Sequence, residues 1–480
     1  MPKITPACLS AVLLLSCLSV SAASFGAGQQ PTGTATPPPP TANPVASQQA
    51  IAFVNQGDTL LDHNDFAGAV AAYQKAIQLD PSFAAAHRGL GITLWRQGNL
   101  SAAWQEMNRV ARLDPTSAAA HYELGRLAEH IASSSAKSAS ADTGLSAGDL
   151  LAIALSELQN ATSLAPNAFN MRLELSQLEL NTGRKKEAQA DALGAIPLAS
   201  TATERALAHV ALGRAYNSTG DEMRAEAEYR KAIQEDPSSG AAYVGLGEIA
   251  LFQQNTGQAQ RYFNQAVEHS PDYGPAYAAL GQLYLQAHQR TEALGMLQKA
   301  VALDPSDWQS QFDLGKLLME AGESARAKEM FTKILAVRPD FLEAGEQLAL
   351  LSLRQGDVQR ALGQAQRLLA RDPQAVEGHR VLALAYWRQR QTDNSLAECA
   401  QALAIDPHST SMLALQSFVL WQTRRRKDAR RVLLEVARAH PDILSPVVFC
   451  RQIVCGSADV MLVGEFLRQN RWILAPTGPQ

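Results

Sequence analysis

Apolar residues recur along most of the chain at spacings of three and four, which is the pattern of amphipathic helices that bury one stripe. In the run 274–305, one such stripe contains Leu280, a second begins near Ala293, and a short polar turn separates them. Proline disfavours a helical conformation at the residue before it, so Pro305 marks the end of the unit. The pattern therefore predicts two helices joined as one helical hairpin.

The hairpin pattern repeats every 34 residues. Prolines close successive units at this interval, at Pro81 and Pro115 and again at Pro237, Pro271, Pro305, Pro339, Pro373, Pro407 and Pro441. A fixed period of this size indicates stacked hairpins, because one hairpin cannot bury its apolar faces alone. We count about eleven units over 49–441, with a serine-rich insertion at 132–148 that we expect to be flexible. The fourth unit departs most from the pattern, since Ser176 replaces the usual glycine and Pro197 falls inside the expected second helix.

The order of aromatic residue, leucine-glycine pair, aromatic residue, alanine and proline within each period resembles the tetratricopeptide repeat. The resemblance covers about residues 50–441 and implies an all-α fold, a right-handed α-solenoid of helix-turn-helix repeats. It also implies that the first helices line a concave groove that binds peptides or partner domains. Residues 442–480 fall outside the period, and we expect them to form capping helices followed by a loose tail.

The N-terminal region has the pattern of an export signal followed by a spacer. Residues 1–23 combine Lys3, an apolar stretch and small residues that suit cleavage after Ala22. Alternatively, the segment ending before Cys17 resembles a bacterial lipoprotein signal, in which Cys17 would become a lipid anchor. Residues 24–48 are rich in proline and threonine, which predicts a disordered linker. We therefore expect an exported bacterial-type protein, either periplasmic or extracellular, or alternatively an outer-membrane lipoprotein.

Composition narrows the classes of function further. The net charge is −4 over 480 residues, which does not favour a nucleic-acid-binding protein. Beyond the signal, no segment has the run of about 20 apolar residues that a membrane-spanning helix needs. The sequence leaves the oligomeric state open.

Three cysteines follow the signal, which is too few for a disulfide framework. Cys450 and Cys455 could form a disulfide only if the expected helix breaks between them, and the alternative is that both pack as free thiols. Histidines recur at one phase of different units, at His87, His121, His209 and His379. Their separation into different units predicts packing residues and not a metal site.

The first candidate site is a row of large side chains five residues past the repeat leucine of each first helix. The row contains Trp95, Leu180, Leu251, Leu285, Met319, Leu353, Trp387 and Trp421. If exposed, these residues would form an apolar stripe that suits an extended or helical segment of a partner. The alternative is that they pack against the neighbouring unit. Arg88, Phe312, Lys316 and Arg380 lie nearby and would add contacts in the groove.

The second candidate site is a basic patch formed by Arg424, Arg425, Arg426, Lys427, Arg430 and Arg431. Such a patch could contact anionic lipid, an acidic partner or a polysaccharide, or it could be an ordinary solvated surface. A GxGxxA match at 245–250 lies inside an expected helix and lacks the strand that a dinucleotide site requires.

The sequence therefore predicts a non-enzymatic scaffold of the cell envelope that binds other proteins or peptides and uses no cofactor. The alternative is an accessory subunit of a complex for envelope polysaccharide export or synthesis, or for secretion.

Overall fold

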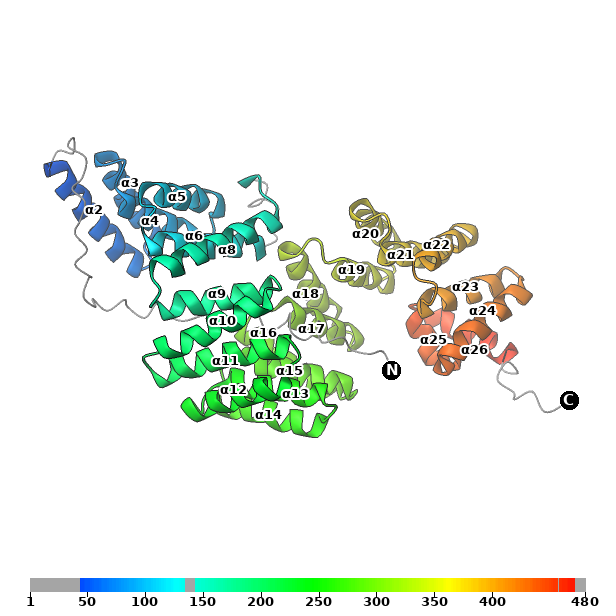
Figure 1. Ribbon diagram of the computed structural model, residues 1–480. Coiled ribbons are helices and arrows are strands. Elements are labelled where there is room, and N and C mark those ends of the chain that lie inside the picture. Colours follow the sequence, from blue (N-terminus) through cyan, green and yellow to red (C-terminus); the bar gives the residue numbers. More distant parts are fainter. Residues whose placement is uncertain (1–43, 134–142, 456, 471–480) are drawn as a thin grey trace. The chain divides into compact units, whose positions relative to one another are not determined.

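The computed structural model describes residues 44–133, 143–455 and 457–470, and this part of the chain contains 24 α-helices and no strand (Figure 1). The chain divides into two compact units, the first ending at Asp307 and the second starting at Trp308. Both units are built from helical hairpins stacked in chain order. This arrangement confirms the all-α solenoid that the period predicts.

The first unit contains seven hairpins (Figure 1). Their helices are α2 (Pro44–Asp62) with α3 (Phe66–Leu79), α4 (Ala84–Arg96) with α5 (Leu100–Leu113), α6 (Ala118–Ser133) with α8 (Ala147–Leu164), α9 (Phe169–Asn181) with α10 (Lys185–Ala195), α11 (Ala202–Ser218) with α12 (Glu222–Glu235), α13 (Gly240–Phe252) with α14 (Thr256–His269), and α15 (Gly274–Gln286) with α16 (Arg290–Leu303).

The second unit contains four hairpins and a helical cap. The hairpins are α17 (Trp308–Glu320) with α18 (Ser324–Val337), α19 (Leu342–Arg354) with α20 (Val358–Arg371), α21 (Val376–Arg388) with α22 (Thr392–Ile405), and α23 (Thr410–Gln422) with α24 (Arg426–Ala439). The cap consists of the 3₁₀ helix η2 (Pro441–Leu444), α25 (Pro446–Gln452) and α26 (Ser457–Gln469). Together the two units give the eleven repeats expected from the prolines.

The two helices of a hairpin cross where a small residue of the first helix meets a large side chain of the second. A Cβ atom on Gly247 would lie 2.2 Å from the ring of Phe263, so the crossing requires glycine there. In the fourth repeat Ser176 occupies this position, and its hydroxyl donates a hydrogen bond of 2.9 Å to the carbonyl oxygen of Ala188. Serine therefore fits because its one polar atom has a partner inside the crossing.

The turns between paired helices are fixed by capping residues. The side chain of Asn99 accepts a hydrogen bond from the backbone N–H of Ala102 at the start of α5, and Asp221 accepts one from Arg224 at the start of α12. In the fourth repeat α10 ends at Ala195, and the 3₁₀ helix η1 (Ile196–Leu198) accommodates Pro197, which lacks the N–H that a longer α-helix would need.

Two helix boundaries differ from the sequence-based expectation. Helix α2 begins at Pro44, so residues 44–48 of the expected linker are helical; proline is tolerated in a first turn because its missing N–H has no partner there. Helix α6 extends to Ser133, and α8 begins at Ala147 behind a capping box formed by Ser146 and Asp149. Both ends of the expected flexible insertion are therefore helical. The expected signal at 1–23, the possible anchor at Cys17 and the expected tail lie outside the described residues.

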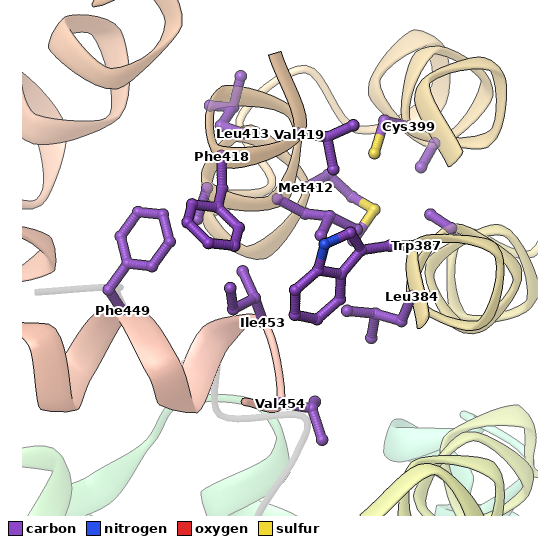
Figure 2. Close-up of a cluster of buried hydrophobic side chains, with 14 of the residues drawn as sticks. Leu384, Trp387, Cys399, Met412, Leu413, Phe418, Val419, Phe449, Ile453 and Val454 are labelled. Atoms are coloured by element: carbon purple, nitrogen blue, oxygen red, sulfur yellow. The ribbon is translucent and has the colours of Figure 1, made fainter. Parts of the chain in front are cut away.

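The cap covers the apolar surface of the last repeat. Figure 2 shows Phe449 and Ile453 of the cap close to Phe418 of α23, within one cluster of buried side chains. The ring of Phe418 also contacts that of Phe466 of α26, with 5.5 Å between centroids. These contacts bury an apolar face that has no further repeat to cover it.

Candidate interaction surface on the first helices

A row of polar side-chain pairs joins the first helices of neighbouring repeats, and we call this row the first-helix ladder. Its pairs are Arg88–Glu123 (2.6 Å), Arg126–Glu174 (3.2 Å), Arg214–Gln177 (3.3 Å) and Arg380–Glu346 (3.1 Å). The first three pairs link α4, α6, α9 and α11 of the first unit, and the fourth links α19 and α21 of the second. Within each unit the ladder therefore places charged groups of both signs on the first helices of neighbouring repeats.

In each arginine–glutamate pair of the ladder the arginine is more exposed than the carboxylate. The side chain of Arg88 is 44% exposed and that of Arg126 41%, whereas those of Glu123 and Glu174 are 14% and 15% exposed. Burial raises the pKa of the Glu174 carboxyl, and the Arg126 guanidinium opposes this rise.

The pKa values of two carboxyls on the first helices are more strongly raised, that of the ladder member Glu346 and that of Glu248. Burial raises the pKa of Glu346 to about 7, although the Arg380 guanidinium favours its charged form. Glu248 of α13 also has its pKa raised by burial to about 7, and the Arg214 guanidinium partly offsets this effect. Within the described part of the chain, Glu248 Oε1 has no hydrogen-bond donor. The first-helix face thus holds carboxyls that titrate near neutral pH.

The expected apolar stripe is largely buried in the second unit. Met319 is 7% exposed, Leu353 3% and Trp387 6%, and the indole N–H of Trp387 donates to Gln422 Oε1 at 3.0 Å. These side chains fill the space between neighbouring hairpins, as the packing alternative required. In the second unit these side chains are therefore packed between hairpins and do not form an exposed apolar surface.

The remaining members of the stripe are half-buried. The ring of Trp421 stacks on Phe418, and its indole N–H donates to Gln469 Oε1 of the cap at 3.0 Å. Trp95 lies under the guanidinium of Arg126, 5.7 Å from the ring centroid, so its face is covered by the ladder. Leu180, Leu251 and Leu285 are also half-buried.

The other expected groove residues have different surroundings. Arg88 and Arg380 are members of the ladder, as described above. Phe312 is buried, with Lys316 Nζ 5.3 Å from the centroid of its ring. The half-exposed ammonium of Lys316 also lies 3.9 Å from the Asp313 carboxylate. Arg88 and Lys316 are thus exposed, although each is also within ion-pair distance of a carboxylate.

The basic patch is exposed but partly engaged within its own chain. Arg425 and Arg431 both lie within ion-pair distance of Asp428, at 3.0 and 3.8 Å. Arg426 donates to Gln469 Oε1 of the cap at 3.3 Å. Arg424, Lys427 and Arg430 are exposed at the same turn. Intramolecular contacts therefore account for part of this charge cluster.

The repeat histidines take part in a recurring pair that the sequence reasoning missed. The Nδ1 atom of each lies 2.5 to 2.7 Å from a glutamate of the second helix in the same hairpin: His87–Glu106, His121–Glu157, His209–Glu228 and His379–Glu398. In three of them Nε2 faces the carbonyl oxygen of the preceding repeat proline, Pro81, Pro115 or Pro373. In three of the pairs the histidine and the glutamate are 19 residues apart, and this constant spacing could have predicted the pairs from the sequence.

Among the described residues, no group of three or more histidine, cysteine, aspartate or glutamate side chains is arranged to hold a metal ion. Within the same residues, no helix combines the length and the apolar character needed to span a membrane.

Several solved structures are similar to this chain at low sequence identity. A tetratricopeptide repeat protein from Parabacteroides merdae is 16% identical, with a TM-score of 0.46, and the match covers 57% of this chain and 99% of that one. Yeast Tom70 is 14% identical, with a TM-score of 0.34 and coverage of 89% and 98%. YrrB, described as a TPR protein with an unusual peptide-binding site, is 20% identical, with a TM-score of 0.34 and coverage of 37% and 92%. No curated protein matches the sequence.

The family comparison is more direct. Models of the tetratricopeptide repeat match residues 54–118 and 346–410, and also residues 216–283, 250–314 and 284–351, together more than half of the chain. The unmatched part between 119 and 215 contains the interrupted third repeat and the divergent fourth. The eleven hairpins and these matches lead to one conclusion: the chain belongs to the tetratricopeptide repeat family, whose stacked hairpins support protein–protein interaction scaffolds.

Proposed function

We propose that this protein is a non-enzymatic scaffold that binds a polar segment of a partner polypeptide along the first-helix ladder of its first unit. The observation that carries the proposal is the ladder itself, in which half-exposed arginines alternate with carboxylates over α4, α6, α9 and α11. The stripe residues of the first unit are half-buried, and the ring of Trp95 lies beneath Arg126, so the charged groups are the chemistry that these helices offer to a partner.

The ladder suits exchange of partners because its guanidinium groups can be reached from solvent. The Arg88 side chain is 44% exposed although the carboxylate that it contacts is 14% exposed, so a carboxylate of a partner competes with Glu123 for this guanidinium. Each replacement gives the arginine a new carboxylate and the glutamate a new donor. Repetition over several helices then provides specificity through the order of charges.

Site-specific photo-crosslinking tests this proposal. A photoreactive residue at Arg96 or Gln286, both exposed at one phase of the first helices, is expected to capture a partner in cells. The same residue at Gln78 or Gln234, exposed on second helices, is the matched control. Capture at the control positions alone would place binding on the other face. Loss of the captured band in an Arg88→Glu, Arg126→Glu variant would identify the ladder as the site.

We also propose that the protein is exported and works in the cell envelope. The support is the signal pattern in residues 1–23 and the spacer that follows it. Intact-mass measurement of protein purified from fractionated cells tests this: a mature chain starting after Ala22, or an acylated Cys17, agrees with export. A full-length chain in the cytosolic fraction contradicts it.

The alternative role in a polysaccharide complex depends on the basic patch being available to a glycan. Arg425 and Arg431 contact Asp428, and Arg426 contacts the cap, so the polypeptide-binding function is better supported.

A further inference from the structure

The cap contains a turn that brings two cysteine side chains together. Helix α25 ends at Gln452 with Ile453 as its C-cap, and Val454 takes a left-handed conformation with φ of 52°. The N–H of Cys455 donates to the carbonyl oxygen of Cys450 at 2.9 Å. This is the Schellman arrangement, in which the residue two past the C-cap bonds back to the third residue from the helix end. Side chains at these two positions commonly touch, and here both are cysteines.

The two thiols interact directly. The thiols are close enough for each to shift the pKa of the other. The helix therefore breaks between the two cysteines, which is the condition that the sequence set for a disulfide. Both residues are free thiols in this structure and both are half-buried, in contrast to the fully buried Cys399.

The turn is held in an unfavourable conformation by its surroundings. A β-branched residue such as valine is rarely found at positive φ, where glycine or asparagine is usual. Arg388 of α21 donates to the carbonyl oxygen of Val454 and also forms an ion pair of 3.1 Å with Asp459 of α26. Ile453 and Val454 are buried in the cluster drawn in Figure 2. The tenth repeat thus fixes the geometry that brings the thiols together.

We propose that Cys450 and Cys455 form a redox-sensitive pair that a small external disulfide oxidises to an intramolecular disulfide, which crosslinks the turn between α25 and α26 of the cap. The Cys450 thiolate attacks one sulfur of the external disulfide, which forms a mixed disulfide and releases one thiolate. The Cys455 thiolate then attacks the Cys450 sulfur and releases the second. Two protein thiols are oxidised to one disulfide, and the external disulfide is reduced to two thiols.

The structure also sets the expected rate. Burial raises the pKa of both thiols, and the nearby Cys455 side chain opposes this rise at Cys450. Cys450 is therefore the first nucleophile, and exchange is slow at neutral pH because little thiolate is present. The disulfide consequently acts as a stable structural crosslink within the cap and not as a catalytic pair that is rapidly oxidised and reduced.

Peptide mapping of the full-length protein tests the inference. The protein is equilibrated in buffers of oxidised and reduced glutathione, alkylated and digested. In the oxidising buffer we expect one peptide region in which Cys450 and Cys455 are unalkylated and joined, whereas Cys399 stays a thiol. In the reducing buffer both take up the alkylating agent. Two alkylated thiols in the oxidising buffer, a stable glutathione adduct, or a link to another cysteine would overturn the proposal.

Hydrogen exchange tests the structural consequence separately. Oxidation is expected to slow exchange of the amides of α25 and α26 by on the order of tenfold, because the crosslink restricts the opened state. The Cys450→Ser variant keeps the turn without the crosslink and should show equal exchange in both buffers. Equal exchange in the oxidised and reduced wild type would refute the bracing role.

Discussion

Phe418 offers the sharpest test of how the cap and the last repeats depend on each other. Its side chain is 0% exposed, and its ring contacts Trp387 at 5.8 Å, Phe449 at 6.1 Å and Phe466 at 5.5 Å between centroids. One side chain therefore joins the tenth repeat, the eleventh repeat and both cap helices. Replacing it with alanine removes these contacts and leaves a cavity that a rigid crossing of helices cannot close.

The Phe418→Ala variant is expected to lose about 3–5 kcal/mol of stability in this region, the usual cost of truncating a buried phenylalanine. Repeats of a solenoid contact only their neighbours, so the loss should stay local. Hydrogen exchange should become faster by about two to four orders of magnitude for amides of α23 to α26. The matched control is Phe252→Ala, since Phe252 is 60% exposed and its loss should cost less than about 0.5–1 kcal/mol.

Peptide-resolved hydrogen exchange in both variants distinguishes the possible outcomes. Fast exchange confined to the cap and the last repeats would agree with the expectation that the aromatic contacts of Phe418 stabilise only this region. Unchanged exchange in α25 and α26 would show that Phe418 does not hold the cap. Equal acceleration throughout the first unit would refute the nearest-neighbour reasoning.

The pKa of Glu248 is raised from 4.5 to about 7, so the folded state retains a proton that the unfolded state releases. Stability should therefore fall as pH rises through this interval, and urea unfolding of Glu248→Gln should show a smaller pH dependence; an unchanged slope would contradict this. Gly247→Val should destabilise the sixth hairpin by about 2 kcal/mol or more, because an aromatic ring lies 2.2 Å from the added carbon. Gly295→Ala, with no atom within 4 Å, should stabilise α16 by about 0.5–1 kcal/mol, and thermal unfolding compares the two. A double-mutant cycle of Arg88→Ala and Glu123→Ala should give a coupling energy of about 1 kcal/mol or more, because two nitrogens of Arg88 donate to a largely buried carboxylate; a value near zero would argue against an ordered ladder.

Much of this fold follows from local sequence. Three local features of the sequence predict eleven hairpins. They are the interval of 34 residues, the small residue at most helix crossings and the prolines that follow most second helices. These features are local because a hairpin forms from contacts close in sequence, and each repeat carries its own copy of them. Departures such as Ser176 and Pro197 were visible too, although only the structure shows how a hydroxyl and a 3₁₀ turn accommodate them.

The exposure of each face was decided by the tertiary structure. Trp387 and Met319 have the phase of a groove-lining residue, yet both are buried, because the tilt of one hairpin on the next determines which positions face solvent. Arg126 and Glu174 lie on opposite sides of the insertion, so their separation in sequence differs from the repeat period and did not predict their contact. The contact between Cys450 and Cys455 depends on a left-handed valine held by a distant arginine. Sequence alone thus determined the repeats and their order, while packing between repeats determined the surface they present, because that surface depends on contacts that no single period contains.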